Sequence, residues 1–177
     1  LELAKKQVSN ITLISDVPNF LHHATLYATA TGKSRAESIL PLAEIFAPYP
    51  NVTILQDTVT SFDPHRNLVI GEKQYSYDTL VLALGSVTTY FGIDGVAAHS
   101  YGIKSVSEID AFTAHIRDEV VKDHQLDRNY FVIGAGPTGV ELAGALNQHL
   151  GDLKSVHKDL KGTPRVTIVE AAPRIIP

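Results

Sequence analysis

The stretch YFVIGAGPTGVE, residues 130–141, decides the fold that we predict for this chain. Four residues typical of a β-strand, 130–133, run directly into the glycine-rich turn Gly134-Ala135-Gly136-Pro137-Thr138-Gly139. Helix-forming residues follow from Val140 to Leu146. A strand, a glycine turn and a helix in this order place the positive end of a helix dipole where a pyrophosphate can bind. The stretch therefore predicts a βαβ unit that binds a nucleotide.

The three glycines of the turn are spaced so that each has a separate role. Gly134 allows the tight turn, Gly136 lets the backbone approach the phosphates, and Gly139 lets the helix pack closely on the strand. A G-x-G-x-x-G motif alone is a weak signal, because glycines recur by chance in turns that bind no nucleotide. The sequence around it has to support the assignment.

Support comes from a second strand-like run, residues 165–169, which ends on Glu170. A carboxylate at this position can accept hydrogen bonds from both hydroxyls of an adenosine ribose. The gap from Gly139 to Glu170 is about 30 residues, against the usual ~20. We attribute the excess to an insertion over residues 149–164. Together these features favour a dinucleotide site over a turn without a ligand.

Length and composition describe an ordinary globular chain. The length of 177 residues is enough for one large domain or two small ones. The composition, 44% hydrophobic and 19% charged, is that of a soluble globular chain. A net charge of -4 gives no basic surface for nucleic acid. No signal peptide is recognised, and no apolar run approaches the roughly 18 residues of a membrane span.

Cysteine and histidine usage narrows the chemistry. The chain has no cysteine, which excludes disulfides, thiolate nucleophiles and Cys-based metal sites from these residues. Its eight histidines lack the spacing of a metal site, so we predict no bound metal. The chain also begins with leucine and contains no methionine, and we expect it to be a piece of a longer protein.

The first half of the chain indicates another βαβ unit. Residues 1–6 are typical of the end of a helix, and residues 11–14 of a buried strand that ends on Ser15-Asp16. We expect the leading strand and glycine turn of this unit to precede Leu1. Residues 18–32 are irregular, residues 38–46 have helical spacing, and residues 51–55 form another strand.

An antiparallel meander and a linker follow. Short strands are predicted at 58–62, 68–70 and 74–77, with turn residues between them. Residues 80–84 form a continuous apolar strand, and residues 87–99 a loop. A helix at 105–123 begins with a capping box, Ser105 to Glu108, and leads to the strand at Tyr130.

Several of these runs resemble a known family. YDTLVLALGS, residues 77–86, resembles the second flavin motif of flavoproteins with two dinucleotide-binding domains. FGIDG at 91–95, the glycine turn with its helix, and VTIVEAAPRIIP at 166–177 are similar to type II NADH dehydrogenases. The resemblance covers nearly the whole chain, and its most specific part is GPTGVELA, residues 136–143.

The resemblance implies an α/β fold with two Rossmann-like βαβ units, the first truncated, beside the antiparallel meander. Residues 1–104 would form a partial FAD-binding domain, and residues 105–177 the N-terminal part of an NADH-binding domain. The implied cofactors are FAD and NADH, and no side chain is assigned a catalytic role, because the flavin carries the chemistry.

For NADH, the resemblance assigns the pyrophosphate to the glycine turn and the adenosine ribose to Glu170. Glu141 would lie near the nicotinamide side of the flavin; its alternative role is to complement the helix N-terminus. The residues assigned to NADH are Gly134, Ala135, Gly136, Pro137, Thr138, Gly139, Glu141 and Glu170.

For FAD, the resemblance assigns backbone groups of Val59 to the adenine. Ala83, Leu84 and Gly85 would pass beside the flavin nucleotide, although the family more often has threonine where Leu84 stands. The acid for the FAD ribose is expected directly after the strand, where this chain has Ser15. Either Asp16 replaces it one residue later, or the ligand is a different residue.

The implied function is FAD-dependent oxidation of NADH with transfer of electrons to a quinone. The full-length protein would be cytoplasmic and would bind the inner face of the cell membrane through segments after Pro177. The family resemblance is also compatible with a homodimer. The alternatives are a related cysteine-free reductase with a ferredoxin-type protein acceptor, or an inactive nucleotide-binding fragment.

Because Glu170 would repel a 2′-phosphate, we predict a preference for NADH over NADPH.

Overall fold

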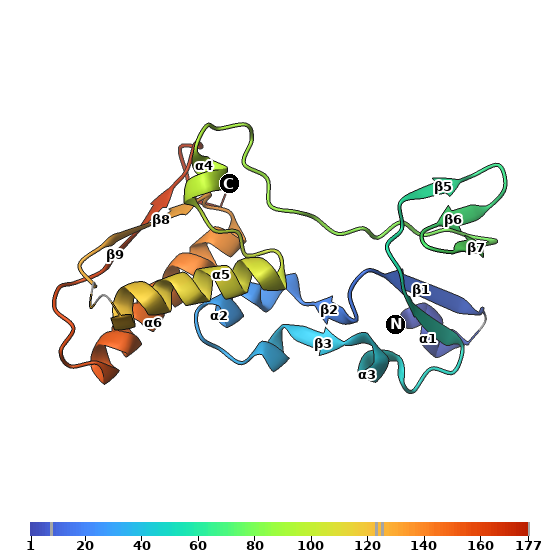
Figure 1. Cartoon of the computed structure of the whole chain (residues 1–177), viewed down its shortest axis with the longest axis horizontal. Helices are drawn as coiled ribbons and strands as arrows, with labels where there is room; N and C mark the ends of the chain where they lie inside the picture. Colours follow the sequence, from blue (N-terminus) through green and yellow to red (C-terminus); the bar gives the residue numbers. More distant parts are fainter. Residues whose placement is uncertain (8, 123, 125, 177) are drawn as a thin grey trace. The chain divides into compact units, whose positions relative to one another are not determined.

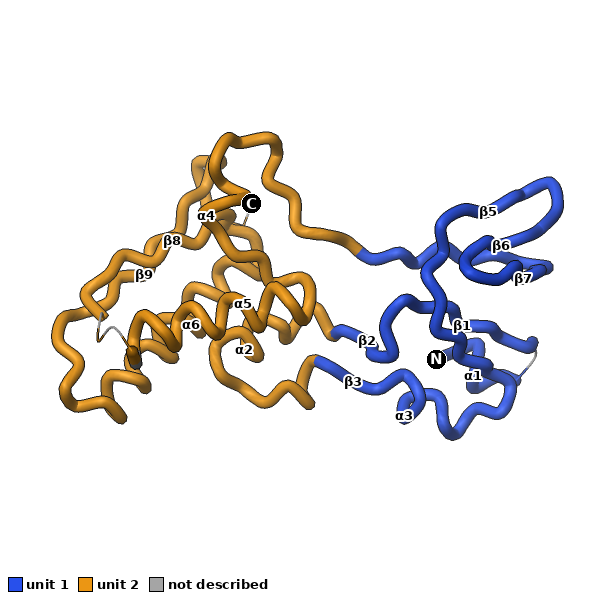
Figure 2. The backbone as a smooth tube through the Cα atoms, in the orientation of Figure 1, with its two compact units in different colours: residues 1–21, 39–85 blue, residues 22–38, 86–177 orange. Residues whose placement is uncertain are grey.

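The computed structural model describes residues 1–7, 9–122, 124 and 126–176. The chain forms two compact units (Figure 2). The first unit comprises Leu1–Leu21 and Ile39–Gly85, and the second comprises His22–Ser38 and Ser86–Pro177. These units are defined by packing and not by a bound nucleotide, so the division into FAD and NADH domains at residues 104 and 105 stays a prediction.

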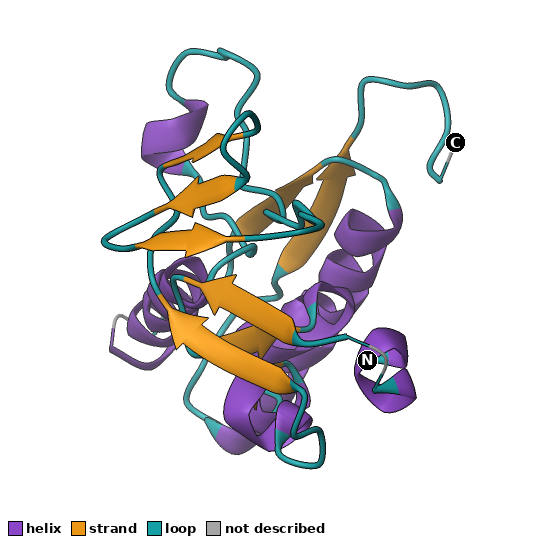
Figure 3. Cartoon of the chain, turned by 90° about the vertical axis from the view of Figure 1, so that its right-hand side faces the viewer, coloured by secondary structure: helices purple, strands orange, loops and turns teal. Residues whose placement is uncertain are grey.

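The first unit combines a parallel strand pair with antiparallel strands (Figure 3). Strand β1 pairs in parallel with β4, from Ile11 opposite Val52 to Ser15 opposite Gln56. β2 and β3 are antiparallel, and β5, β6 and β7 form the predicted meander (Figure 1), although its first strand is Ser61–Asp63 and not 58–62. The elements of this unit are α1 (Glu2–Lys6), β1 (Ile11–Ser15), β2 (Asn19–Leu21), β3 (Ile39–Pro41), α3 (Leu42–Phe46), β4 (Val52–Gln56), β5 (Ser61–Asp63), β6 (Leu68–Ile70) and β7 (Gln74–Ser76).

The second unit contains the predicted strand–turn–helix–strand unit. β8 and β9 are parallel, in register from Asn129 opposite Arg165 to Ile133 opposite Val169, and α6 connects them. The βαβ prediction around residues 130–141 is therefore confirmed. The elements of this unit are η1 (His23–Thr25), α2 (Leu26–Ala30), η2 (Arg35–Glu37), α4 (Val96–His99), α5 (Val106–Arg117), the π-helical η3 (Asp118–Lys122), β8 (Asn129–Ile133), α6 (Pro137–Val156) and β9 (Arg165–Val169).

The core of the second unit lies on the face of β8 and β9 that α6 covers. Val132 is buried, whereas its neighbours Phe131 and Ile133, which point to the opposite face, are 64% and 63% exposed. The buried members of the core cluster are Ile116, Val120, Leu126, Leu146, Leu150 and Leu160. The segment 149–164, to which we attributed the excess length, begins as two further turns of α6, and its Leu150 belongs to this core.

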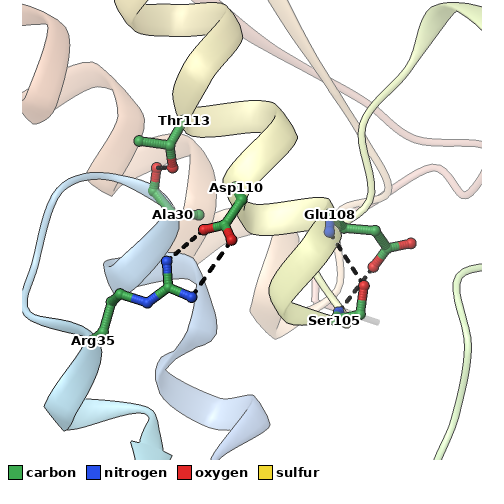
Figure 4. A network of polar contacts seen from close by, with 6 residues as sticks. All are labelled: Ala30, Arg35, Ser105, Glu108, Asp110 and Thr113. Atoms are coloured by element: carbon green, nitrogen blue, oxygen red, sulfur yellow. Dashed lines mark hydrogen bonds and ion pairs between the residues drawn. The ribbon is translucent and has the colours of Figure 1, made fainter.

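Residues 22–38 pack on α5, although they are far from it in the sequence (Figure 4). Leu26 and Ala30 of α2 pack with Ile109 of α5. The Thr113 hydroxyl donates to the Ala30 carbonyl at 3.3 Å, and Arg35 forms an ion pair with Asp110. These contacts attach the segment to the helix that leads into β8.

The predicted capping box at the start of α5 is confirmed (Figure 4). The Ser105 hydroxyl accepts from the Glu108 N–H at 3.2 Å, and the Glu108 carboxylate accepts from the Ser105 N–H at 2.9 Å. The α-helix ends at Arg117 and continues as η3, and Asp123, the predicted last residue, lies outside the described residues.

The prediction of a strand at residues 80–84 is wrong. The run has no regular structure, and Val81 and Leu84 are 75% and 82% exposed. A strand needs a hydrogen-bonded neighbour, and no described strand pairs with this run. The apolar pattern alone therefore does not produce a strand here.

Three other local predictions also need correction. The predicted helix at 38–46 begins only at Leu42, because Pro41 cannot lie in a helix interior and instead ends the strand Ile39–Pro41. Residues 18–32 are not irregular, because they contain β2 and α2. The predicted loop at 87–99 also contains a single helical turn, α4.

Candidate nucleotide-binding site

The glycine turn connects the end of β8 to the start of α6. Gly134 has a φ of +103°, a conformation that favours glycine, and its N–H donates to the Val169 carbonyl at 2.8 Å. Gly136 is the N-cap of α6, and Pro137 is the first helical residue. Proline is suited to this position because its missing N–H would have no partner within the helix.

Gly139 and Gly136 differ sharply in what surrounds them. A Cβ atom on Gly139 would lie 2.0 Å from the carbonyl oxygen of Gly134, so only glycine allows α6 to pack this closely on the turn. A Cβ atom on Gly136 would meet no heavy atom within 4 Å. Protein packing therefore requires Gly139 to be glycine, whereas Gly136 leaves space that a ligand can occupy.

The N-terminus of α6 is open to an anion. No side chain of the described residues caps it, and the first bond within the helix runs from the Val140 N–H to the Gly136 carbonyl at 3.1 Å. The N–H groups of Thr138 and Gly139 precede that bond and have no partner within the helix. With 20 residues of aligned peptide dipoles behind it, this end suits a pyrophosphate.

Glu170 directly follows β9, and its carboxylate reaches the glycine turn. One oxygen accepts from the Ala135 N–H at 2.7 Å, and the other from the Ala172 N–H at 2.9 Å. The hydrogen bonds from Ala172 and Ala135 lower the pKa of Glu170 below its ordinary value. A carboxylate has about four acceptor positions, so a ribose hydroxyl can still donate to Glu170.

Glu141 lies on α6, and its side chain is exposed. The first turn of α6 contains no acidic residue, so Glu141 lies beyond it. The helix dipole acts on charges mainly within the first turn, which weakens the alternative explanation that Glu141 serves the helix N-terminus. Its predicted position near the flavin stays a prediction.

A cavity of about 710 Å³ lies beside the turn, within the second unit. Four residues of the turn line it, together with β8, α5, α6 and aromatic residues of the 88–104 segment such as Tyr90 and Tyr101. This volume lies in the range of small-molecule sites. The turn residues in its lining are Gly134, Gly136, Thr138 and Gly139. The cavity reaches the turn but not Glu170.

The residues predicted for FAD lie in the first unit. Among the described residues, no hydrogen bond connects one of them to another. Asp16 is exposed and its carboxylate has no hydrogen-bond partner in the described structure, whereas the Ser15 hydroxyl accepts from the Val17 N–H at 3.4 Å. Asp16 is thus available to a ribose. Ala83, Leu84 and Gly85 are exposed without regular structure, and Val59 is partly buried after β4. Their roles stay predictions.

Asp57 is an anchoring residue that the sequence analysis missed. It directly follows β4, is buried, and accepts from the Tyr75 hydroxyl at 2.6 Å and from the N–H groups of Glu72 and Lys73 at 2.9 and 3.3 Å. The Tyr75 hydroxyl and then the Glu72 N–H lower the pKa of Asp57. The available signal was an acid directly after a strand, followed by a hairpin whose turn contains Gly71. A Cβ atom on Gly71 would lie 2.6 Å from this carboxylate.

Neither a metal cluster nor a spanning helix occurs in the part of the chain that the structure describes. No group of three or more His, Asp or Glu side chains there is placed to hold a metal ion. None of the helices formed by those residues combines the length and apolar character that crossing a membrane requires.

The match to a family model extends over the whole chain. Residues 1–177 fit the model described as pyridine nucleotide-disulphide oxidoreductase. The chain belongs to this family. The predicted α/β fold of nucleotide-binding units and the predicted membership in a family of pyridine-nucleotide oxidoreductases are thereby confirmed. The disulphide in the family's description has no counterpart here, because the 177 residues contain no cysteine.

Curated and solved relatives agree with this assignment. A type II NADH:quinone oxidoreductase of Staphylococcus aureus is 31% identical over 96% of this chain and 44% of its own length. The crystal structure of a sulfide:quinone oxidoreductase from Aquifex aeolicus matches 93% of this chain and 38% of its own, with 25% identity and a TM-score of 0.71. A water-forming NADH oxidase from Lactobacillus brevis, solved bound to NADH, shares the fold with a TM-score of 0.63 and 23% identity, over 99% of this chain and 37% of its own. The similarity to type II NADH dehydrogenases is confirmed, and the chain spans less than half of the curated relatives.

Proposed function

We propose that this chain is the nucleotide-binding part of a FAD-dependent oxidoreductase that takes hydride from NADH and passes the electrons to a quinone. The observation that carries the proposal is the hydrogen bond between Glu170 and Ala135. It brings the Glu170 carboxylate, which we assign to the adenosine ribose, to the glycine turn. The similarity to the Staphylococcus aureus type II NADH:quinone oxidoreductase supports the choice of nucleotide and acceptor.

In this function the second unit binds NADH. The N–H groups at the start of α6 receive the pyrophosphate in the space beside Gly136, and Glu170 accepts from the adenosine ribose. The cavity next to the turn accommodates the nicotinamide half of NADH. Because Glu170 holds the adenosine ribose and does not line this cavity, the nicotinamide ring lies on the other side of the turn. These residues bind and orient the nucleotide, and none of them needs to act as an acid or a nucleophile.

The first unit contributes to FAD binding through Asp16 at the end of β1, through Val59, and through Ala83, Leu84 and Gly85. When bound, FAD supplies the redox chemistry by accepting the hydride and passing electrons onward. The free Asp16 carboxylate fits a ribose, and the open segment at residues 83–85 leaves its backbone accessible. A peripheral position at the inner face of the cell membrane follows from the quinone assignment.

The acceptor is tested by steady-state oxidation of NADH by the full-length protein. We expect turnover with a short-chain soluble quinone and little turnover with a ferredoxin-type protein under the same conditions. Turnover with the ferredoxin-type protein alone would exclude the quinone assignment. A protein that binds FAD and NADH but turns over with neither acceptor would favour a nucleotide-binding role without catalysis.

A further inference from the structure

Both backbone groups of Ala135, the second residue of the glycine turn, are held by the segment that follows β9. Ala135 is fully buried. Its N–H donates to one oxygen of Glu170 at 2.7 Å, and its carbonyl accepts from the Ile176 N–H at 2.9 Å. The preceding residue is held as well, because the Gly134 N–H donates to the Val169 carbonyl at 2.8 Å. The turn is therefore connected to β9 and to its following segment at three points.

The Glu170 carboxylate is central to these connections because it also binds its own segment. Its second oxygen accepts from the Ala172 N–H at 2.9 Å, so the side chain bridges the turn and residues 170–172. Hydrogen bonds to a carboxylate are shorter and stronger than those between neutral groups. Without this carboxylate, the buried Ala135 N–H would lack an acceptor, and the turn would rearrange to find one.

We propose that Glu170 is a positioning residue for the glycine turn, in addition to its contact with the adenosine ribose. By holding the Ala135 N–H, it keeps Gly136 and the first N–H groups of α6 in the arrangement that a pyrophosphate requires. A site that is ordered before binding loses less entropy on binding. This inference rests on the proposed NADH site and extends it, because it predicts that Glu170 contributes to binding of the phosphates that it does not touch.

The two roles are separable with a pair of ligands. A ribose contact acts only on nucleotides that carry the ribose hydroxyls, whereas a positioning role acts on every ligand with a pyrophosphate. ADP has both features, and 2′,3′-dideoxy-ADP has the pyrophosphate without the hydroxyls. Loss of affinity for the dideoxy nucleotide in a Glu170 variant therefore measures the positioning role alone.

The experiment is calorimetric titration of both nucleotides into the full-length protein with FAD bound, so that the flavin site is filled. Wild type is compared with Glu170→Ala, with Glu170→Gln, and with Glu44→Ala, which removes an exposed carboxylate from α3. We expect Glu170→Ala to weaken binding of 2′,3′-dideoxy-ADP about tenfold, as for loss of one hydrogen bond to a charged group. Glu170→Gln, which keeps one acceptor oxygen for Ala135, should recover most of that affinity, and Glu44→Ala should match wild type.

The outcomes separate this inference from the proposed function. If Glu170→Ala loses affinity for ADP but binds 2′,3′-dideoxy-ADP like wild type, Glu170 acts through the ribose alone and the positioning role is refuted while the NADH site stands. If the wild-type protein binds neither nucleotide, the NADH site is wrong and this inference is refuted with it. Should Glu170→Ala fail to fold, Glu170→Met decides, because it fills the same space without an acceptor for the Ala135 N–H: unchanged affinity for 2′,3′-dideoxy-ADP together with loss of affinity for ADP would refute the positioning role.

Discussion

Replacing Gly139 with alanine should destabilise the protein itself and not only its complex with NADH. The new Cβ atom would lie 2.0 Å from the Gly134 carbonyl oxygen and 3.0 Å from its carbon. Close carbon–oxygen contacts in proteins are about 3.3 Å, so the turn or the start of α6 must move by roughly 1.3 Å. The obstructing atoms belong to the backbone and cannot rotate away. Overpacking usually costs about 1–3 kcal/mol, and we expect Gly139→Ala at or above the upper end.

Two other glycines provide matched controls for this substitution. Gly144 lies in the interior of α6, and its Cβ would meet nothing within 4 Å, so Gly144→Ala should stabilise by about 0.5–1 kcal/mol. Gly136 has a φ of -69° and equally open surroundings, so Gly136→Ala should leave stability nearly unchanged. Only the NADH complex should respond to that change, because the methyl group enters the space assigned to the phosphates.

The assay is urea denaturation of the three full-length variants, followed by far-ultraviolet circular dichroism, with NADH affinity measured by calorimetry on those that fold. The expected order of stability is Gly144→Ala above Gly136→Ala, with Gly139→Ala well below both. A Gly139→Ala protein as stable as Gly144→Ala would refute the close contact between α6 and the turn. Wild-type NADH affinity in Gly136→Ala would refute the assignment of the open space to the phosphates.

Further predictions concern the two carboxylates that follow strands. Glu170→Ser should narrow the preference for NADH over NADPH, because it removes the charge that repels a 2′-phosphate; equal or better kcat/KM of wild type with NADPH would contradict this role. The N–H groups of Ala172 and Ala135 lower the folded-state pKa of Glu170 from its ordinary 4.5, so the stability that this carboxylate contributes is present above about pH 4.5 and lost as the pH falls through the folded-state value. Urea denaturation over a pH series should therefore show a smaller acid loss for Glu170→Gln than for wild type, and identical profiles would contradict this. Asp57 raises the pKa of Tyr75 above its ordinary value, and Asp57→Asn should lower the pKa of Tyr75, identified in an ultraviolet titration by its loss in Tyr75→Phe; an unchanged Tyr75 pKa would contradict the contact.

The parts of the fold that could be predicted from sequence are those set by local signals. The strand, glycine turn, helix and second strand around residues 130–169 follow from hydrophobic pattern and from the spacing of three glycines. The capping box from Ser105 to Glu108 and the meander at residues 61–76 likewise depend on neighbours in the sequence. For the same reason, the position of Glu170 directly after a strand could be recognised before its contact with the turn was known.

The features that could not be predicted depend on partners distant in the sequence. Residues 80–84 have the pattern of a buried strand, but a strand forms only beside another one. The helix at Leu26–Ala30 is short, and it is held by Ile109 and Thr113 of α5, which no local pattern around residue 26 reveals. Asp57 resembled an ordinary polar residue after a strand, because its donors lie 15 or more residues later.

The central claim, that the glycine turn at residues 134–139 binds NADH while FAD is bound elsewhere, is tested most directly by anaerobic titration of the full-length protein with NADH, followed by flavin absorbance. Wild type should be reduced by about one equivalent of NADH. Gly136→Val places a branched Cβ in the space assigned to the phosphates, and this variant should retain its yellow flavin, be reduced by dithionite, and respond little to NADH. Loss of flavin from Gly136→Val with unchanged NADH binding, or reduction by NADH as in wild type, would contradict the assignment.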